Sequence, residues 1–213
     1  MLRDTYKEDD KMKKRTWINL VLISMVLSIG TWIPSVDGAS DAFKGNIYNV
    51  GTLKPIDSKL LVKVGSPAPD FTLPSVAGDK VTLRQYQGKK NVVLSFVPAA
   101  WTLVCSDQWP GYNIVKDIFA QKDSILLGIT VDNIPTLFAW TNQMGQLWFP
   151  VLSDFWPHGK VAKKYGVLRS NGVSERALFV INKKGIIRYI DVHDINKRPP
   201  LEELVKALEK LGE

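Results

Sequence analysis

Two uninterrupted apolar runs lie in the middle of the chain, at residues 91–97 and 124–131. Such runs, without polar alternation, are typical of strands buried on both faces of a sheet. The intervening residues, 103–121, place apolar side chains such as Ile114 and Ile118 one helical turn apart. Strand, crossover helix and strand predict a βαβ unit whose two strands are parallel.

The following residues predict further elements in a different order. Residues 134–143 and 158–165 are expected to be helices, and Gly166 is expected to end the second one. Two more apolar segments, 177–182 and 186–191, flank a Lys-Lys-Gly turn and predict an antiparallel hairpin.

An amphipathic helix, predicted for residues 201–211, follows the Pro199-Pro200 pair near the end of the chain. A βαβ unit followed by a hairpin and a terminal helix is the element order of the thioredoxin fold. The expected fold class is therefore α/β, with a thioredoxin-like central mixed sheet flanked by helices.

Residues 17–33 carry no charge and follow a basic cluster at residues 11–15. At ~1.5 Å per residue, a helix over this segment would be about 25 Å long, near the minimum that crosses a bilayer. Two interpretations stay open. The apolar helix belongs either to a secretory signal peptide cut after Gly38 or to an uncleaved membrane anchor. Both place the bulk of the chain outside the cytoplasm.

The sequence therefore divides into three predicted parts: a signal peptide or anchor at residues 1–38, a linker at residues 39–63 and a folded domain at residues 64–213. The 213 residues are 45% hydrophobic and 23% charged, which excludes wholesale disorder. A formal net charge of +7 favours anionic surfaces. No zinc-finger spacing or basic recognition helix indicates nucleic acid as a partner.

Cys105 is the only cysteine in the chain. A single thiol excludes an intrachain disulfide, a Cys-x-x-Cys pair and a cysteine-rich metal site. Cys105 follows the first predicted strand, where the chain enters a helix, and the positive end of a helix stabilises the nucleophilic thiolate. A lone cysteine is as often an inert buried residue, so its position alone leaves both interpretations open.

The residues before the cysteine carry a resemblance to a known family. Pro98-Ala-Ala-Trp-Thr-Leu-Val-Cys105 matches the Pro-x-x-x-Thr-x-x-Cys motif of the peroxiredoxins, the alkyl hydroperoxide reductase and thiol-specific antioxidant class. Five further blocks resemble that family in order and spacing: residues 65–73, 78–88, 152–154, 159–167 and 175–181. The resemblance covers about residues 64–211 and implies a thiol-dependent peroxidase.

The resemblance implies roles for four residues. Cys105 would be the peroxidatic cysteine, and Arg176 would hold its thiolate and polarise the peroxide, since a guanidinium stays charged. Thr102 would hydrogen-bond the peroxide or the thiolate, and Pro98 would pack over the thiol and exclude water. Attack of the thiolate on hydrogen peroxide or an organic hydroperoxide would leave a sulfenic acid, without a metal or organic cofactor.

Two features depart from the family pattern. Without a second cysteine, the protein is expected to be of the one-cysteine type and to need an external thiol or a thioredoxin-like reductant. Gln108 stands where family members often carry glutamate, and Pro110 predicts a bend in its helix. A homodimer is expected by analogy with the family. The alternative function is a thioredoxin-like redox-sensing or interaction module without peroxidase turnover.

Overall fold

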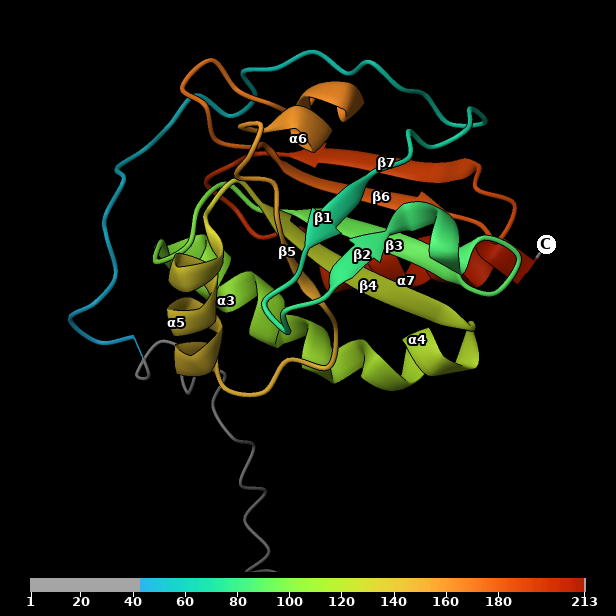
Figure 1. Ribbon diagram of the computed structural model, residues 1–213, viewed down its shortest axis with the longest axis horizontal. Coiled ribbons are helices and arrows are strands. Elements are labelled where there is room, and N and C mark those ends of the chain that lie inside the picture. Colours follow the sequence, from blue (N-terminus) through green and yellow to red (C-terminus); the bar gives the residue numbers. More distant parts are fainter. Residues whose placement is uncertain (1–42, 213) are drawn as a thin grey trace, which may run out of the picture. The chain divides into compact units, whose positions relative to one another are not determined.

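The computed structural model describes residues 43–212, which fold around a five-stranded sheet in the order β5-β4-β3-β6-β7 (Figure 1). Strands β3, β4 and β5 are parallel, whereas β6 and β7 pair antiparallel. The strands are β3 (Asn91–Phe96), β4 (Ser124–Thr130), β5 (Val151–Ser153), β6 (Arg176–Ile181) and β7 (Ile187–His193). The predicted parallel pair and the predicted hairpin are both confirmed, and the fold is a thioredoxin-like mixed α/β fold.

Helices cover both faces of this sheet, in agreement with the expected fold class (Figure 1). One face carries α3 (Leu103–Gly111), α4 (Lys116–Gln121), α5 (Ile134–Met144) and α7 (Leu201–Glu209). The other face carries α6 (Lys160–Tyr165), a small hairpin of β1 (Thr72–Pro74) and β2 (Lys80–Thr82), and a 3-10 helix (Leu83–Tyr86).

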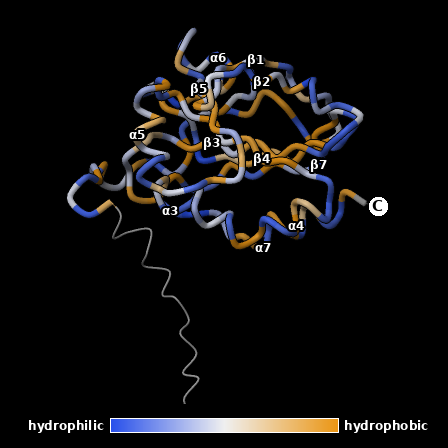
Figure 2. The backbone as a smooth tube through the Cα atoms, turned by 60° about the horizontal axis from the view of Figure 1, so that its bottom comes forward, coloured by the Kyte–Doolittle hydropathy of each residue, from blue (hydrophilic) through white to orange (hydrophobic). Residues whose placement is uncertain are grey.

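Strand β3 shows how the apolar pattern produces two cores. Because side chains alternate along a strand, Val92 and Leu94 pack into the core beneath α6, while Val93 packs into the core beneath α3 and α7. Every residue of β3 is buried, as the uninterrupted apolar run predicts. In Figure 2 the hydrophobic colouring follows the central strands, and α7 shows alternating colours that fit its predicted amphipathic character.

The predicted crossover helix at residues 103–121 is divided into three pieces. Helix α3 contains Pro110, a 3-10 helix (Tyr112–Val115) follows it, and α4 completes the crossover. Proline has no backbone N–H to donate to the carbonyl four residues earlier, which weakens the α-helical ladder at this point. The α-helix ends at Gly111, one residue after Pro110, and a change of helix type follows at the place where a bend is expected.

Three short strands have no counterpart among the elements predicted from hydrophobic periodicity: β1, β2 and β5, of three residues each. A segment of three residues is too short to display a period of two. Strand β5 is identified only by its pairing with β4, which extends the parallel part of the sheet.

Residues 43–63, most of the predicted linker, form no α-helix or named strand but pack closely against the rest of the domain. Phe43 is buried, with its ring 5.9 Å from that of Trp101. Gly166 ends α6 in the left-handed conformation at φ +76°, and a Cβ atom there would lie 2.3 Å from the backbone nitrogen of Leu61. This backbone approach is compatible only with glycine.

The predicted apolar helix and the signal peptide or anchor at residues 1–38 lie outside the described residues. Within residues 43–212, no helix combines the length and apolar character needed to cross a membrane.

Candidate active site

Cys105 lies in the first turn of α3, directly after the segment that leaves the carboxyl end of β3. Thr102 is the N-cap residue, and its carbonyl accepts the first helical bond from the Ser106 N–H at 3.0 Å. The first-turn N–H groups of a helix have no acceptor within it and point toward this end. The Cys105 side chain is fully buried, so these dipoles act on its sulfur with little screening by water.

Arg176 is brought to Cys105 by the sheet. It is the first residue of β6, which pairs with β3, and alternation puts its side chain on the same face as Leu178, where α3 packs. Its Nη2 lies 3.5 Å from Cys105 Sγ, and the residue is only 2% exposed. The two residues that the resemblance assigns to thiolate chemistry are therefore in direct contact, although 71 positions separate them in sequence.

Neutral acceptors hold the Arg176 guanidinium in place. The backbone carbonyl of Ile195 accepts from Nε at 3.2 Å and from Nη2 at 3.0 Å, and the Gln108 amide oxygen accepts from Nη1. Within the described part of the chain, no carboxylate makes an ion pair with this guanidinium. Its positive charge is therefore not neutralised by a carboxylate partner and remains available to an ionised Cys105.

Gln108, identified from the sequence only as a departure from the family pattern, connects Arg176 to a buried polar network. Its Nε2 donates to the Tyr112 hydroxyl at 2.8 Å, and that hydroxyl lies 3.3 Å from Ser95 Oγ. Burial raises the pKa of Tyr112, so its hydroxyl stays protonated and uncharged at neutral pH. The network fixes Gln108, and through it Arg176, without adding a charge.

Thr102 and Pro98 complete the surroundings of the sulfur, and both line the same cleft as Cys105. The Thr102 hydroxyl donates to the Ala99 carbonyl at 3.0 Å instead of capping α3. With its proton used in that bond, the hydroxyl oxygen is free to accept a hydrogen bond from a peroxide O–H. Pro98 is buried and lines the cleft together with Cys105, a position that is compatible with the water-excluding role that the resemblance implies.

The cleft above these residues has a volume of about 720 Å³ and an outer wall that no pattern in the sequence predicted. That wall is formed by residues 47–53, which we call the strap. The Tyr48 N–H donates to the Trp101 carbonyl at 2.8 Å, next to the N-cap of α3. At the other end, Leu53 and Asn196 exchange two hydrogen bonds, of 2.9 and 2.8 Å, between a backbone and a side-chain amide.

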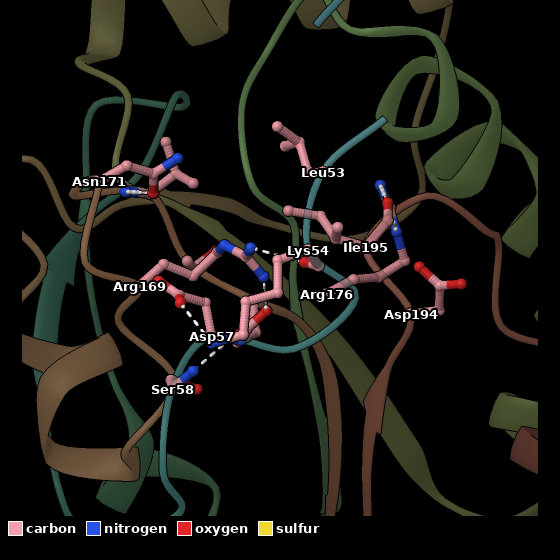
Figure 3. A network of polar contacts seen from close by, with 12 residues as sticks. Leu53, Lys54, Asp57, Ser58, Arg169, Asn171, Arg176, Asp194 and Ile195 are labelled. Carbon is pink, nitrogen blue, oxygen red and sulfur yellow. Dashed lines mark hydrogen bonds and ion pairs between the residues drawn. The ribbon is translucent and has the colours of Figure 1, made fainter. Parts of the chain in front are cut away.

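A buried ion pair secures the chain just beyond the strap. Glu175 is fully buried and pairs at 2.5 Å with Arg169, not with its sequence neighbour Arg176. Its other carboxylate oxygen accepts the backbone N–H groups of Asp57 and Ser58 at 2.6 and 2.8 Å. Figure 3 shows Asp57 and Ser58 next to the Arg169 side chain, with Arg176 and Ile195 nearby.

Comparison with known proteins identifies the family. Residues 64–190 match the AhpC/TSA family, and the chain belongs to it. Alkyl hydroperoxide reductase E of Mycobacterium tuberculosis is 42% identical over 133 residues, covering 62% of this chain and 86% of that protein. Peroxiredoxin TSA1-B of Candida albicans is 36% identical over 156 residues, covering 68% and 78%.

Solved structures agree with this family assignment. The reduced 2-Cys peroxiredoxin of Plasmodium vivax superimposes with a TM-score of 0.66 at 29% identity and covers 70% of this chain and 81% of its own. The protein is thus a peroxiredoxin, a thiol-dependent peroxidase of the oxidoreductase class. The interpretation as a redox module without turnover is the less favoured one.

Proposed function

We propose that this protein reduces hydrogen peroxide or organic hydroperoxides through Cys105, with Arg176, Thr102 and Pro98 as the other site residues. The observation that carries this proposal is the 3.5 Å contact between the Arg176 guanidinium and the buried Cys105 sulfur. The guanidinium places a fixed positive charge beside the sulfur, and the thiolate is the form that attacks a peroxide.

The proposed reaction is a direct attack of sulfur on the peroxide. Cys105 sulfur attacks the O–H oxygen of the hydroperoxide; an S–O bond forms, the O–O bond breaks, and the other oxygen leaves as an alkoxide or hydroxide that takes a proton from water. Arg176 stabilises the charge that moves onto the leaving oxygen, and Thr102 orients the peroxide. Cys105 becomes a sulfenic acid, oxidised by the two electrons that the peroxide gains.

Recycling requires a reductant from outside the chain, because the 213 residues contain no second cysteine. An external thiolate attacks the sulfenic sulfur, so that an S–S bond forms and the S–O bond breaks. The hydroxide that leaves takes up a proton to become water, and a mixed disulfide remains on Cys105. A second thiolate then releases the Cys105 thiolate and forms the external disulfide. Small thiols and thioredoxin-like proteins both supply this chemistry, and a reductant panel at fixed peroxide concentration distinguishes them.

One equivalent of hydrogen peroxide, added to the reduced protein in the presence of dimedone, tests the first step. We expect one dimedone adduct at Cys105 by peptide mass spectrometry and no adduct in the Cys105→Ser variant. A fully reduced Cys105 that gives no adduct would refute the proposal. Sulfenic acid formation without turnover by any thiol would instead support the redox-sensing module.

Two further expectations from the sequence remain part of the proposal. The domain is exported, with residues 1–38 acting as a cleaved signal peptide or a membrane anchor, and the folded protein forms homodimers. Cell fractionation, combined with the mass of the mature chain, tests export and cleavage; a cytoplasmic full-length chain would contradict export. Sedimentation equilibrium of the reduced protein tests the dimer, and a monomer at micromolar concentration would contradict it.

A further inference from the structure

The cleft over Cys105 is much larger than hydrogen peroxide requires. Its volume of about 720 Å³ lies in the range of ~300–1,000 Å³ typical of sites for drug-sized ligands. A water molecule occupies ~30 Å³ in the liquid, and hydrogen peroxide has only one more heavy atom. Most of the cleft is thus available to a part of the substrate other than its O–O group.

The lining of the cleft indicates the chemistry of that part. Of the described residues that line it, Arg176 alone is charged, and it lies beside the reacting sulfur. The strap and the start of α3 contribute three exposed apolar side chains: Tyr48 is 71%, Val50 46% and Leu103 64% exposed. Covering such surface removes it from water, which favours the binding of an apolar group. An uncharged, apolar group fits this wall.

The strap is held in position before any substrate binds. The Tyr48 bond to Trp101 fixes one end, and the reciprocal amide pair between Leu53 and Asn196 fixes the other. Between these points the Asn49 side chain accepts the Gly51 N–H at 2.9 Å and shapes a local turn. A wall fixed in advance loses little conformational entropy when it binds a ligand.

The strap is also separate from the part of the chain that defines the family. The family match begins at residue 64, eleven positions after the strap ends at residue 53. The catalytic residues lie within that match, whereas this wall is supplied by the preceding segment. A substrate in the cleft would therefore meet, at this wall, residues that take no part in the attack on the O–O bond.

We infer that the strap forms the binding site for the apolar group of a bulky organic hydroperoxide and gives this protein a preference for such substrates over hydrogen peroxide. The inference rests on the proposed function of Cys105. Tyr48 and Val50 contact the organic group, and Asn196 positions them. The hydroperoxide O–O group then points toward Cys105 and Arg176 at the base of the cleft.

A double variant, Tyr48→Ser with Val50→Ser, tests this inference with cumene hydroperoxide as the bulky probe. The measurement is the second-order rate of loss of the Cys105 thiol in single turnover, quenched and analysed by mass spectrometry, for cumene hydroperoxide and for hydrogen peroxide. We expect the ratio of the two rates to fall by about tenfold, since contacts of one or two carbon groups discriminate on this scale. Tyr48→Phe with Val50→Ile should keep the ratio near that of the wild type.

Ile114→Ser is the matched control, because Ile114 is 71% exposed but lies outside the cleft lining. An unchanged ratio in the double variant, with Cys105 still oxidised by both peroxides, would overturn the inference alone. An unchanged ratio with slower reduction by thiols would also overturn it and would assign the strap to the reductant. Failure of both peroxides to oxidise wild-type Cys105 would refute the proposed function together with the inference.

Discussion

The base of the cleft and its outer wall are built in different ways. At the base, Cys105 and Arg176 are placed by a helix and a strand that pack against β3, so the regular sheet determines their separation. The strap has no named strand or helix of its own and is held by individual hydrogen bonds to Trp101 and Asn196. Cys105 and Arg176 are thus placed by regular elements of the core, whereas the wall depends on individual hydrogen bonds and on the packing of Ile47 against that core.

The largest effect is expected from a substitution at the base of the cleft, where Arg176 contacts Cys105. Arg176→Lys keeps a positive charge but loses the planar set of donors that contacts Sγ, Gln108 and Ile195 together. We expect the rate of Cys105 oxidation by hydrogen peroxide to fall by about 10²–10³-fold, as when one stabilising donor is removed from an oxyanion site. Single-turnover kinetics measures it.

Lys184→Arg is a control that exchanges the same two residue types in the opposite direction. Lys184 lies in the turn between β6 and β7, so this variant is expected to react at the rate of the wild type. A rate for Arg176→Lys within threefold of the wild type would show that the guanidinium contact does not determine reactivity.

The next effect concerns the buried Glu175–Arg169 ion pair, which holds the chain just beyond the strap. Glu175→Gln can still accept the Asp57 and Ser58 N–H groups but leaves the Arg169 charge buried without its carboxylate. Loss of one partner of a buried pair costs about 3 kcal/mol, which lowers Tm by roughly 10 °C in a domain of this size. Thermal unfolding followed by circular dichroism measures the shift.

Glu203→Gln is the matched control, since Glu203 pairs with Lys206 at the surface of α7. Its loss is expected to change Tm by no more than about 2 °C. Equal Tm values for the two variants would mean that the buried pair does not stabilise this end of the wall.

The smallest effect is a dependence on pH at Asp57. Hydrogen bonds from Ser170, followed by that from Lys54, lower the pKa of this carboxyl from its ordinary value of 3.8. Because the folded pKa is the lower one, the stabilisation is present above pH 3.8 and is lost as the pH falls below that value. Asp57→Asn removes this titration.

Urea unfolding of both proteins at pH 6 and at pH 3 provides the measurement. We expect the wild type to be the more stable at pH 6 and the difference between the two proteins to shrink at pH 3. If the difference in the free energy of unfolding between the two proteins is the same at both pH values, the ionised Asp57 carboxylate does not stabilise the fold.

The base of the cleft could be predicted from the sequence, whereas the strap could not. The long apolar runs predicted β3 and β4 because an apolar run is a local signal. The family resemblance, through the motif that ends at Cys105 and the later block at residues 175–181, indicated Cys105 and Arg176 as partners before their contact was known. The strap gave no such signal. Its bonds to Asn196 and those of Asp57 and Ser58 to Glu175 join residues more than 100 positions apart, and they use backbone groups that every sequence contains.

Gln108 was predicted only in part. The sequence indicated that an amide stands where a carboxylate is common, but not that this amide connects Arg176 to Tyr112 in a buried network. That connection depends on the packing of α3 against β3 and β6, which involves three separate segments of the chain. Only the folded arrangement defines what the amide contacts.

Trp109, which shares a buried cluster with Cys105, offers a fluorescence readout of the proposed oxidation without an added dye. Trp109 lies one helical turn after Cys105 in the same buried cluster; its indole N–H donates to Ser95 at 3.2 Å, and Gly128 leaves space for its ring. Conversion of a thiolate to a neutral sulfenic acid changes the electric field at that indole. A change in stopped-flow tryptophan emission is therefore expected when peroxide oxidises Cys105.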